Sequence, residues 1–242
     1  MEFLLMSLAL IASVLIGGVI VHYFKATNKN KSIKLALAFS GGFLLAIIFQ
    51  HLIPDLYHDE HSNIGMFIML GFLIQLVLEY FSGGIEHGHV HIHKGQPLPW
   101  MLFISLSLHS VIEGIPLGNG IVGLESHGHG HTHDSLFLGI IFHQIPVAIA
   151  LMTLLMNTSL KIWQSWMVML LFAVMTPLGQ FLGLFVSTET LGIDTHVVLA
   201  IVVGMFLHIS TTIIFETSEN HKFNLLKLGS ILVGVGLAMG LY

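Results

Sequence analysis

His109 and Glu113 lie four residues apart in an otherwise apolar stretch that reads HSVIEGIPLG. On an α-helix this spacing puts both side chains on one face, about 6 Å apart along the axis. The next apolar segment carries His143, just before Gln144 and Pro146. Imidazole and carboxylate groups are ligands that Zn²⁺ uses in proteins. We therefore predict a metal site built from His109, Glu113 and His143.

The composition identifies the setting of these residues. The chain has 242 residues, of which 55% are hydrophobic and only 9% are charged, and its mean hydropathy is +0.88. Apolar runs of about 20 residues, the length that crosses the hydrocarbon core, recur throughout. We predict an all-α, multi-pass membrane protein with one transmembrane domain over 1–242. The eight expected helices are 3–24, 33–53, 64–82, 98–122, 136–157, 160–187, 193–217 and 225–242. The sixth is long enough that we expect tilt or a break at Pro177.

The lysines predict the orientation of this bundle. The chain has eight lysines and no arginine, and every lysine falls in a connection on one side of the bundle or in the first three residues of the predicted helix that follows it. Short cytoplasmic loops accumulate lysine, so we expect both termini to lie outside. The first apolar segment begins with Glu2 where a secretory signal would carry a basic residue, and we expect it to be the first span.

The predicted depths of the three ligand candidates agree. His109 would lie about 16 Å above the inner end of its helix, and His143 about 12 Å below the outer end of the next. In a core about 30 Å thick these depths meet near the midplane. A single buried histidine could instead be an interhelical hydrogen-bond partner. An unpaired carboxylate such as Glu113, however, costs about 3 kcal/mol at mid-membrane, so its presence favours a bound cation.

Four further polar residues are candidates for a pathway. His51 and Asp55 stand one turn apart near the outer end of the second span, where they form either an entrance or an interfacial cap. His208 lies within the seventh span and Glu216 near its inner end. We expect His208 to line the pathway or the site, and Glu216 to receive the ion on the inner side.

Histidine-rich tracts occupy three predicted loops, at residues 57–61, 86–93 and 127–134. Alternating His-Gly and His-Thr sequences do not pack into a core but offer many exchangeable imidazoles. They form either solvated low-complexity loops or sites of weak metal capture, and we favour capture. The candidate ligands are His87, His89, His91 and His93 in one tract, and His127, His129, His131 and His133 in another.

Four short motifs resemble those of the ZIP (Zrt/Irt-like) metal transporters: HSVIEG, HQIP, HLIPD at 51–55 and TPLGQ at 176–180. The resemblance spans essentially the whole chain. It implies transport of a divalent metal, most often zinc, into the cytosol by alternating access through a site on the fourth and fifth spans. It also implies that Ser110, Gln144 and Gln180 help to hold a second ion. Val147 departs from the family pattern of a bridging glutamate, so we expect one principal ion.

Other functions fit less well. Membrane zinc proteases need an HExxH helix, which is absent from this sequence, so we do not expect an enzyme. A divalent-metal exporter of another family with histidine-rich loops is the alternative. Fe²⁺, Mn²⁺ and Cd²⁺ suit the same ligand types as Zn²⁺. We expect the cytoplasmic membrane as the location and no nucleic-acid partner, while Gly236 and Gly240 would serve internal packing or a homodimer.

Overall fold

The computed structural model describes residues 1–23, 29–58, 63–83, 96–123, 130–185, 194–215 and 225–241. Side chains are described for these residues except 29–31, 119–123 and 130–133. This part of the chain is helical, with no strand longer than an isolated bridge. Its helices are α1 (Glu2–Tyr23), α2 (Lys29–Ile47), the π-helical η1 (Ile48–Leu52), α3 (Ile53–Leu56), α4 (Ile64–Ser82), α5 (Trp100–Gly123), α6 (Gly130–Leu155), α7 (Ile162–Ala173), α8 (Met175–Gly183), α9 (Thr195–Phe215) and α10 (Leu225–Gly240).

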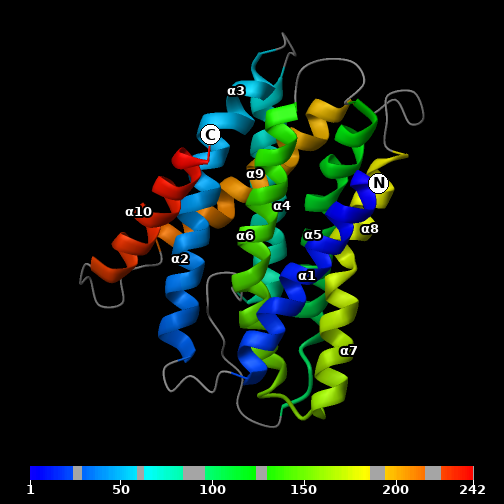
Figure 1. Cartoon of the computed structure of the whole chain (residues 1–242), viewed down its shortest axis with the longest axis vertical. Coiled ribbons are helices and arrows are strands. Elements are labelled where there is room, and N and C mark those ends of the chain that lie inside the picture. Colours follow the sequence, from blue (N-terminus) through cyan, green and yellow to red (C-terminus); the bar gives the residue numbers. More distant parts are fainter. Residues whose placement is uncertain are drawn as a thin grey trace.

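The apolar runs form membrane-length helices. Within the described residues, seven helical stretches are long and apolar enough to cross a membrane, counting α2 to α3 and α7 to α8 as one stretch each. The eighth apolar segment, α10, has 16 residues and a length of about 24 Å. The stretches alternate in direction, and both termini lie toward the same end of the bundle (Figure 1). The predicted all-α, multi-pass membrane fold is confirmed.

Two of the stretches are interrupted next to a proline. The helix of the sixth predicted span ends at Ala173 and resumes at Met175. This break precedes Pro177 by three residues because proline has no N–H for the carbonyl four residues earlier, which belongs to Ala173. The second span widens into the π-helical segment η1 just before Pro54, and His51 lies in it. The interrupted regions are therefore those that carry the HLIPD and TPLGQ sequences.

Four pairs of helices are held together by glycines. If Gly204 of α9 carried a Cβ atom, that atom would lie 1.9 Å from the carbonyl oxygen of Ile68 on α4. A Cβ atom on Gly71 of α4 would likewise lie 1.9 Å from the carbonyl oxygen of Ile201 on α9. Only glycine lets two backbones approach so closely. The other pairs meet in the same way, α5 with α8 through Gly114 and Gly179, α2 with α10 through Gly42 and Gly234, and α1 with α6 through Gly17 and Ala148.

The face of α10 that carries Gly236 and Gly240 makes no such contact with the described residues. We expected these glycines to serve internal packing or a homodimer. No heavy atom of the described residues lies within 4 Å of a Cβ placed at either position, and both glycines are exposed. Internal packing therefore does not use this face of α10.

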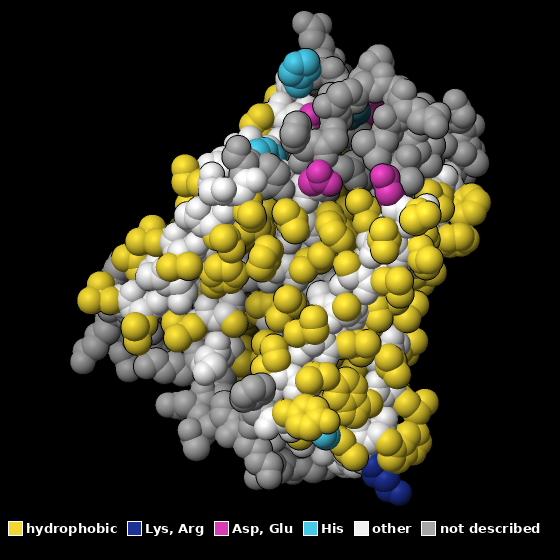
Figure 2. Space-filling view, in the orientation of Figure 1, with side chains coloured by type: hydrophobic (Ala, Val, Ile, Leu, Met, Phe, Trp, Pro, Cys, Tyr) yellow, Lys and Arg dark blue, Asp and Glu magenta, His cyan; other side chains and the backbone are white. Residues whose placement is uncertain are grey.

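The surface separates into an apolar middle and polar ends. On the face drawn in Figure 2, hydrophobic side chains cover the middle, acidic ones lie toward one end and lysine toward the other. Lys34, Lys161 and Lys227 each lie near the start of a helix, α2, α7 and α10, that begins at the end away from the termini. This distribution agrees with the one-sided placement of the lysines. That both termini lie outside stays a prediction from this pattern.

We expect Gly204→Ala to destabilise the protein, because the added methyl group would meet the carbonyl oxygen of Ile68 at 1.9 Å. Overpacking of this kind costs about 1–3 kcal/mol. Thermal unfolding in detergent, followed by tryptophan fluorescence, would measure the loss. Gly236→Ala is the matched control, since open space surrounds that position. Equal unfolding temperatures for the two variants would contradict the role assigned to the α4–α9 contact.

Candidate metal centre

Three ligand-type side chains meet inside the bundle: His109 and Glu113 from α5 and His143 from α6. One ligand atom from each lies within 4.8 Å of those of the other two, and each residue is only 1% exposed. Nε2 of His109 lies 3.3 Å from Oε2 of Glu113. A divalent ion with ordinary bond lengths of about 2.0–2.2 Å could bind all three after small side-chain adjustments.

The local sequence explains this convergence. The four-residue spacing of His109 and Glu113 puts them on one face of α5, as predicted. Pro116 and Pro146 lie inside the continuous helices α5 and α6. Each proline lacks the N–H that would bond the carbonyl four residues earlier, next to Glu113 in α5 and next to His143 in α6. Each proline therefore removes a helical hydrogen bond one residue away from a side chain of the cluster.

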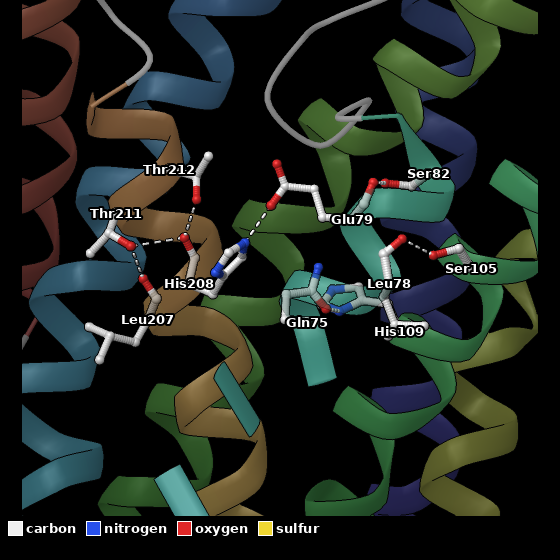
Figure 3. Close-up of polar contacts among 10 residues, drawn as sticks. All are labelled: Gln75, Leu78, Glu79, Ser82, Ser105, His109, Leu207, His208, Thr211 and Thr212. Atoms are coloured by element: carbon white, nitrogen blue, oxygen red, sulfur yellow. Dashed lines mark hydrogen bonds and ion pairs between the residues drawn. The ribbon is translucent and has the colours of Figure 1, made fainter. Parts of the chain in front are cut away.

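Gln75 of α4 orients the first histidine. Its Oε1 lies 3.0 Å from Nδ1 of His109, and Gln75 is fully buried (Figure 3). An amide oxygen only accepts hydrogen bonds, so Nδ1 carries the proton and the lone pair of a neutral imidazole lies on Nε2. That lone pair faces a carboxylate oxygen of Glu113. Two acceptors in this arrangement repel each other, and a cation between them removes the repulsion.

The two carboxylate oxygens of Glu113 have different surroundings. Oε1 accepts hydrogen bonds from the amide of Gln144 at 2.9 Å and from the hydroxyl of Thr176 at 3.1 Å. Gln144 also donates to Thr176 and accepts a bond from Ser13 of α1 at 3.0 Å. Oε2 has no hydrogen-bond donor among the described residues. The network thus fixes Oε1 and leaves Oε2 as the ligand atom.

The second histidine is positioned by packing and by a hydroxyl group. Nδ1 of His143 lies 3.5 Å from the hydroxyl oxygen of Ser40 on α2. The rings of His109 and His143 have centroids 5.9 Å apart, and Phe206 of α9 contacts both edge-on at 6.4 and 6.3 Å. The aromatic ring closes one side of the site with apolar surface. Low polarity there strengthens the attraction between the ligands and a cation.

The three accessory ligand candidates are all buried but differ in their contacts. Gln144 lies next to the centre and gives its amide hydrogens to Glu113 and Thr176. Gln180 contacts α1, where it accepts from Ser7 at 2.8 Å and where its amide nitrogen lies 3.9 Å from the sulfur of Met6. Ser110 is 1% exposed. The structure therefore brings Gln144 to the three-ligand cluster and turns Gln180 toward α1.

Three of the four pathway candidates are among the described residues, and none of the three belongs to the cluster. His51 and Asp55 are half-buried on η1 and α3. His208 is 5% exposed and contacts Glu79 of α4, with Phe72 edge-on at 4.6 Å, and it does not belong to the three-ligand cluster. Glu216 lies outside the described residues.

Most of the histidine tracts also fall outside the described part. This holds for His87, His89, His91, His93, His127 and His129. Residues 130–134 form the start of α6, so the last part of the third tract is helical backbone rather than the predicted loop. The side chains of His131 and His133 are not among those described.

Two residues around the centre were not among the predicted ligands or pathway residues. Gln75 is a polar residue within the third predicted span, and its partner His109 lies on another helix. Thr176 belongs to the TPLGQ sequence, and its position at the helix break before Pro177 could have singled it out. Both are polar residues in apolar segments, and that was the available signal.

Comparison with known proteins finds a matching family model and several relatives. The family model described as "ZIP Zinc transporter" matches residues 82–241. Zinc transporter ZIP1 of Danio rerio is 24% identical over 275 positions, covering 91% of this chain and 88% of the relative. Zinc transporter ZIP1 of Homo sapiens is 25% identical over 266 positions, covering 89% and 80%. Zinc transporter ZIP3 of Bos taurus is 24% identical over 286 positions, covering 91% and 88%.

We expect Gln75→Leu to weaken Zn²⁺ binding at the cluster by about 10–100-fold, the usual cost of losing the group that orients a ligating histidine. Competition with a zinc-sensitive dye on purified protein in detergent would measure the affinity. Gln75→Glu keeps an oxygen acceptor for Nδ1 of His109 and should bind zinc far better than the leucine variant. An affinity unchanged in Gln75→Leu would refute the orienting role.

Proposed function

Because this chain belongs to the ZIP zinc transporter family, we propose that it carries divalent metal ions across a membrane, with Zn²⁺ as the principal substrate. The observation that carries the proposal is the convergence of His109, Glu113 and His143 inside a bundle of membrane-length helices. The ion would occupy these three ligands during its passage. In the cell we place the protein in the cytoplasmic membrane, moving metal into the cytosol.

The ligand set favours zinc. Two imidazoles and one carboxylate leave a fourth coordination position for water or a backbone oxygen, a common arrangement at exchangeable Zn²⁺ sites. The chain has no cysteine, so the site lacks the thiolates that would bind zinc too tightly for release. Fe²⁺, Mn²⁺ and Cd²⁺ are accepted by the same ligand types and would be secondary substrates.

The surroundings of the cluster favour one ion there. The amide group of Gln144 donates a hydrogen bond to Oε1 of Glu113. It therefore occupies the side of the carboxylate through which Glu113 would otherwise bridge to a second cation. Val147, one turn further along α6, is buried and cannot ligate. Gln180 is engaged by Ser7. Ser110, Gln144 and Gln180 therefore support the site in our proposal without holding an ion of their own.

Transport requires the cluster to open alternately to the two sides. Helices that meet through glycine backbones, such as α5 with α8, would move as one unit, because their contact leaves no room for sliding. The residues 1–242 would act as one transporter domain. His51 and Asp55 would receive the ion on the outer side of the membrane and Glu216 would receive it on the inner side. A homodimer would form through the outer surface of the helix bundle.

We expect Glu113→Gln to abolish saturable ⁶⁵Zn²⁺ uptake into proteoliposomes. The amide keeps the shape of the side chain and can accept hydrogen bonds at the position of Oε1, but it removes the negative charge that attracts the ion. Glu2→Gln is the matched control, since Glu2 is exposed at the start of α1, and it should retain wild-type uptake. If Glu113→Gln transports zinc as well as the wild type, the ion does not pass through this cluster.

The histidine tracts should affect transport differently. Replacing the tract histidines at 86–93 and 127–134 with serine should raise the zinc concentration for half-maximal uptake and leave the maximal rate nearly unchanged, because weakly held ions at the loops only increase the local supply. The assay is the same uptake measurement over a range of zinc concentrations. A collapse of the maximal rate would place the tracts in the transport path itself.

A further inference from the structure

Helix α1 reaches the surroundings of the metal centre through the hydroxyl group of Ser13. This residue is 2% exposed, and its Oγ lies 3.0 Å from Oε1 of Gln144 on α6. The two helices are closely packed beside this bond, because a Cβ atom on Gly17 would lie 2.8 Å from the carbonyl oxygen of Ile145. Gly17 and Ser13 are four residues apart and share a face of α1. The close contact therefore brings the hydroxyl within reach of the amide.

The amide group of Gln144 has a defined direction. Its nitrogen lies 2.9 Å from Oε1 of Glu113 and donates to the hydroxyl of Thr176 as well. A carboxylate oxygen only accepts hydrogen bonds, so the nitrogen belongs on that side and the amide oxygen points to Ser13. The Ser13 hydroxyl donates to this oxygen and shares its hydrogen with the carbonyl oxygen of Leu10, 2.7 Å away.

The amide oxygen depends on this hydrogen more than Leu10 does. The carbonyl of Leu10 lies inside α1, where it also accepts the backbone N–H of Val14. Oε1 of Gln144 has Ser13 as its donor, and the residue is only 2% exposed. A buried acceptor that loses its donor is costly. Without the Ser13 hydroxyl, the present direction of the amide would lose one of the bonds that favour it.

A half turn of the amide would change the ligands that the centre offers. Its two ends are nearly equal in size, so the turn needs no additional space. The amide oxygen would then lie beside Oε1 of Glu113 and Oγ of Thr176, which are 3.1 Å apart. Groups of carboxylate, carbonyl and water oxygens suit Mn²⁺, whereas imidazole suits Zn²⁺. In the present direction, amide hydrogens occupy this place and repel a cation.

We propose that Ser13 sets the metal selectivity of the centre, because it holds the nitrogen of Gln144 toward Glu113 and so disfavours oxygen-preferring ions such as Mn²⁺. This inference rests on the proposed function and deepens it. Ser13 is a positioning residue that acts through Gln144. With the amide in this direction, the centre offers two imidazoles and one carboxylate oxygen, a set that suits Zn²⁺.

The same helix engages a second glutamine in the same way. Ser7 of α1 donates to Oε1 of Gln180 at 2.8 Å, and Gln180 is fully buried. Packing alone does not require these hydroxyls, because Gly17 and Ala148 already bring α1 and α6 together. Both amide oxygens nearest to this side of the bundle are thus bonded to α1, which keeps them from acting as metal ligands.

The test compares Zn²⁺ and Mn²⁺ binding to the purified full chain in detergent by isothermal titration calorimetry. The tract histidines at 86–93 and 127–134 are replaced by serine in every sample, so that the loops do not contribute. In Ser13→Ala we expect the ratio of Mn²⁺ affinity to Zn²⁺ affinity to rise by about tenfold, the order of magnitude that a hydrogen bond to a buried group contributes. Ser13→Thr keeps the hydroxyl and should keep the wild-type ratio.

Ser165→Ala is the matched control. It removes a hydroxyl from α7 that is 1% exposed and lies 3.5 Å from the carbonyl oxygen of Lys161 in its own helix. General loosening of the bundle would lower the affinity for both ions and leave their ratio unchanged. We therefore expect the wild-type ratio in this variant.

A double-mutant cycle shows whether Ser13 acts through Gln144. In Gln144→Leu, which has no amide to turn, Ser13→Ala should leave the ratio unchanged. No rise in Ser13→Ala, or an equal rise with and without the amide, would overturn the inference while the centre stands. If the wild-type chain does not bind zinc, or binds it equally well after Glu113→Gln, the proposed function fails instead.

Discussion

The central constraint is that several hydrogen-bond acceptors lie close together in an apolar interior. A carboxylate oxygen of Glu113 faces the lone pair of His109, and His143 lies beside them. Water does not screen them, because all three residues are buried. Such a group is stable only with a cation, or with donors supplied from elsewhere. The surrounding hydrogen bonds from Gln144 and Thr176 satisfy one oxygen, and the other has no donor among the described residues.

This constraint determines what the neighbouring helices must do. The rings and the carboxylate need fixed orientations, and these are set by groups on helices other than their own, Gln75 on α4 and Thr176 on α8. Close backbone contacts keep those helices in place. A Cβ on Gly114 of α5 would lie 2.2 Å from the carbonyl oxygen of Thr176, so the glycine that permits this contact also sets the position of the hydroxyl. The contact that packs these two helices therefore also determines the ligand geometry in this part of the molecule.

Sequence reasoning found the groups that helix periodicity and depth in the membrane bring together, and it missed the contacts that depend on which helices lie side by side. The spacing of His109 and Glu113, and the apolar length of each span, follow from helix periodicity and were predicted. The pairing of His109 with Gln75 could not be read in this way, because no local pattern names the helix that will lie alongside. His208 was expected to line the path, and only the fold reveals Glu79 as its partner. The sixth span was predicted to tilt or break at Pro177, whereas proline acts on the carbonyl four residues earlier and the helix ends at Ala173.

Helix α4 is the least enclosed of the membrane-length helices, because only 17% of the residues in its most apolar stretch are buried inside the protein. It nevertheless carries Gln75 and Glu79, which orient two buried rings. About half of its residues are exposed, and in a membrane they would face acyl chains. Bilayer thickness influences the tilt of a helix. A change in tilt moves both acceptor oxygens relative to their histidines. Through α4 the thickness of the bilayer would therefore influence the orientation of both histidine rings.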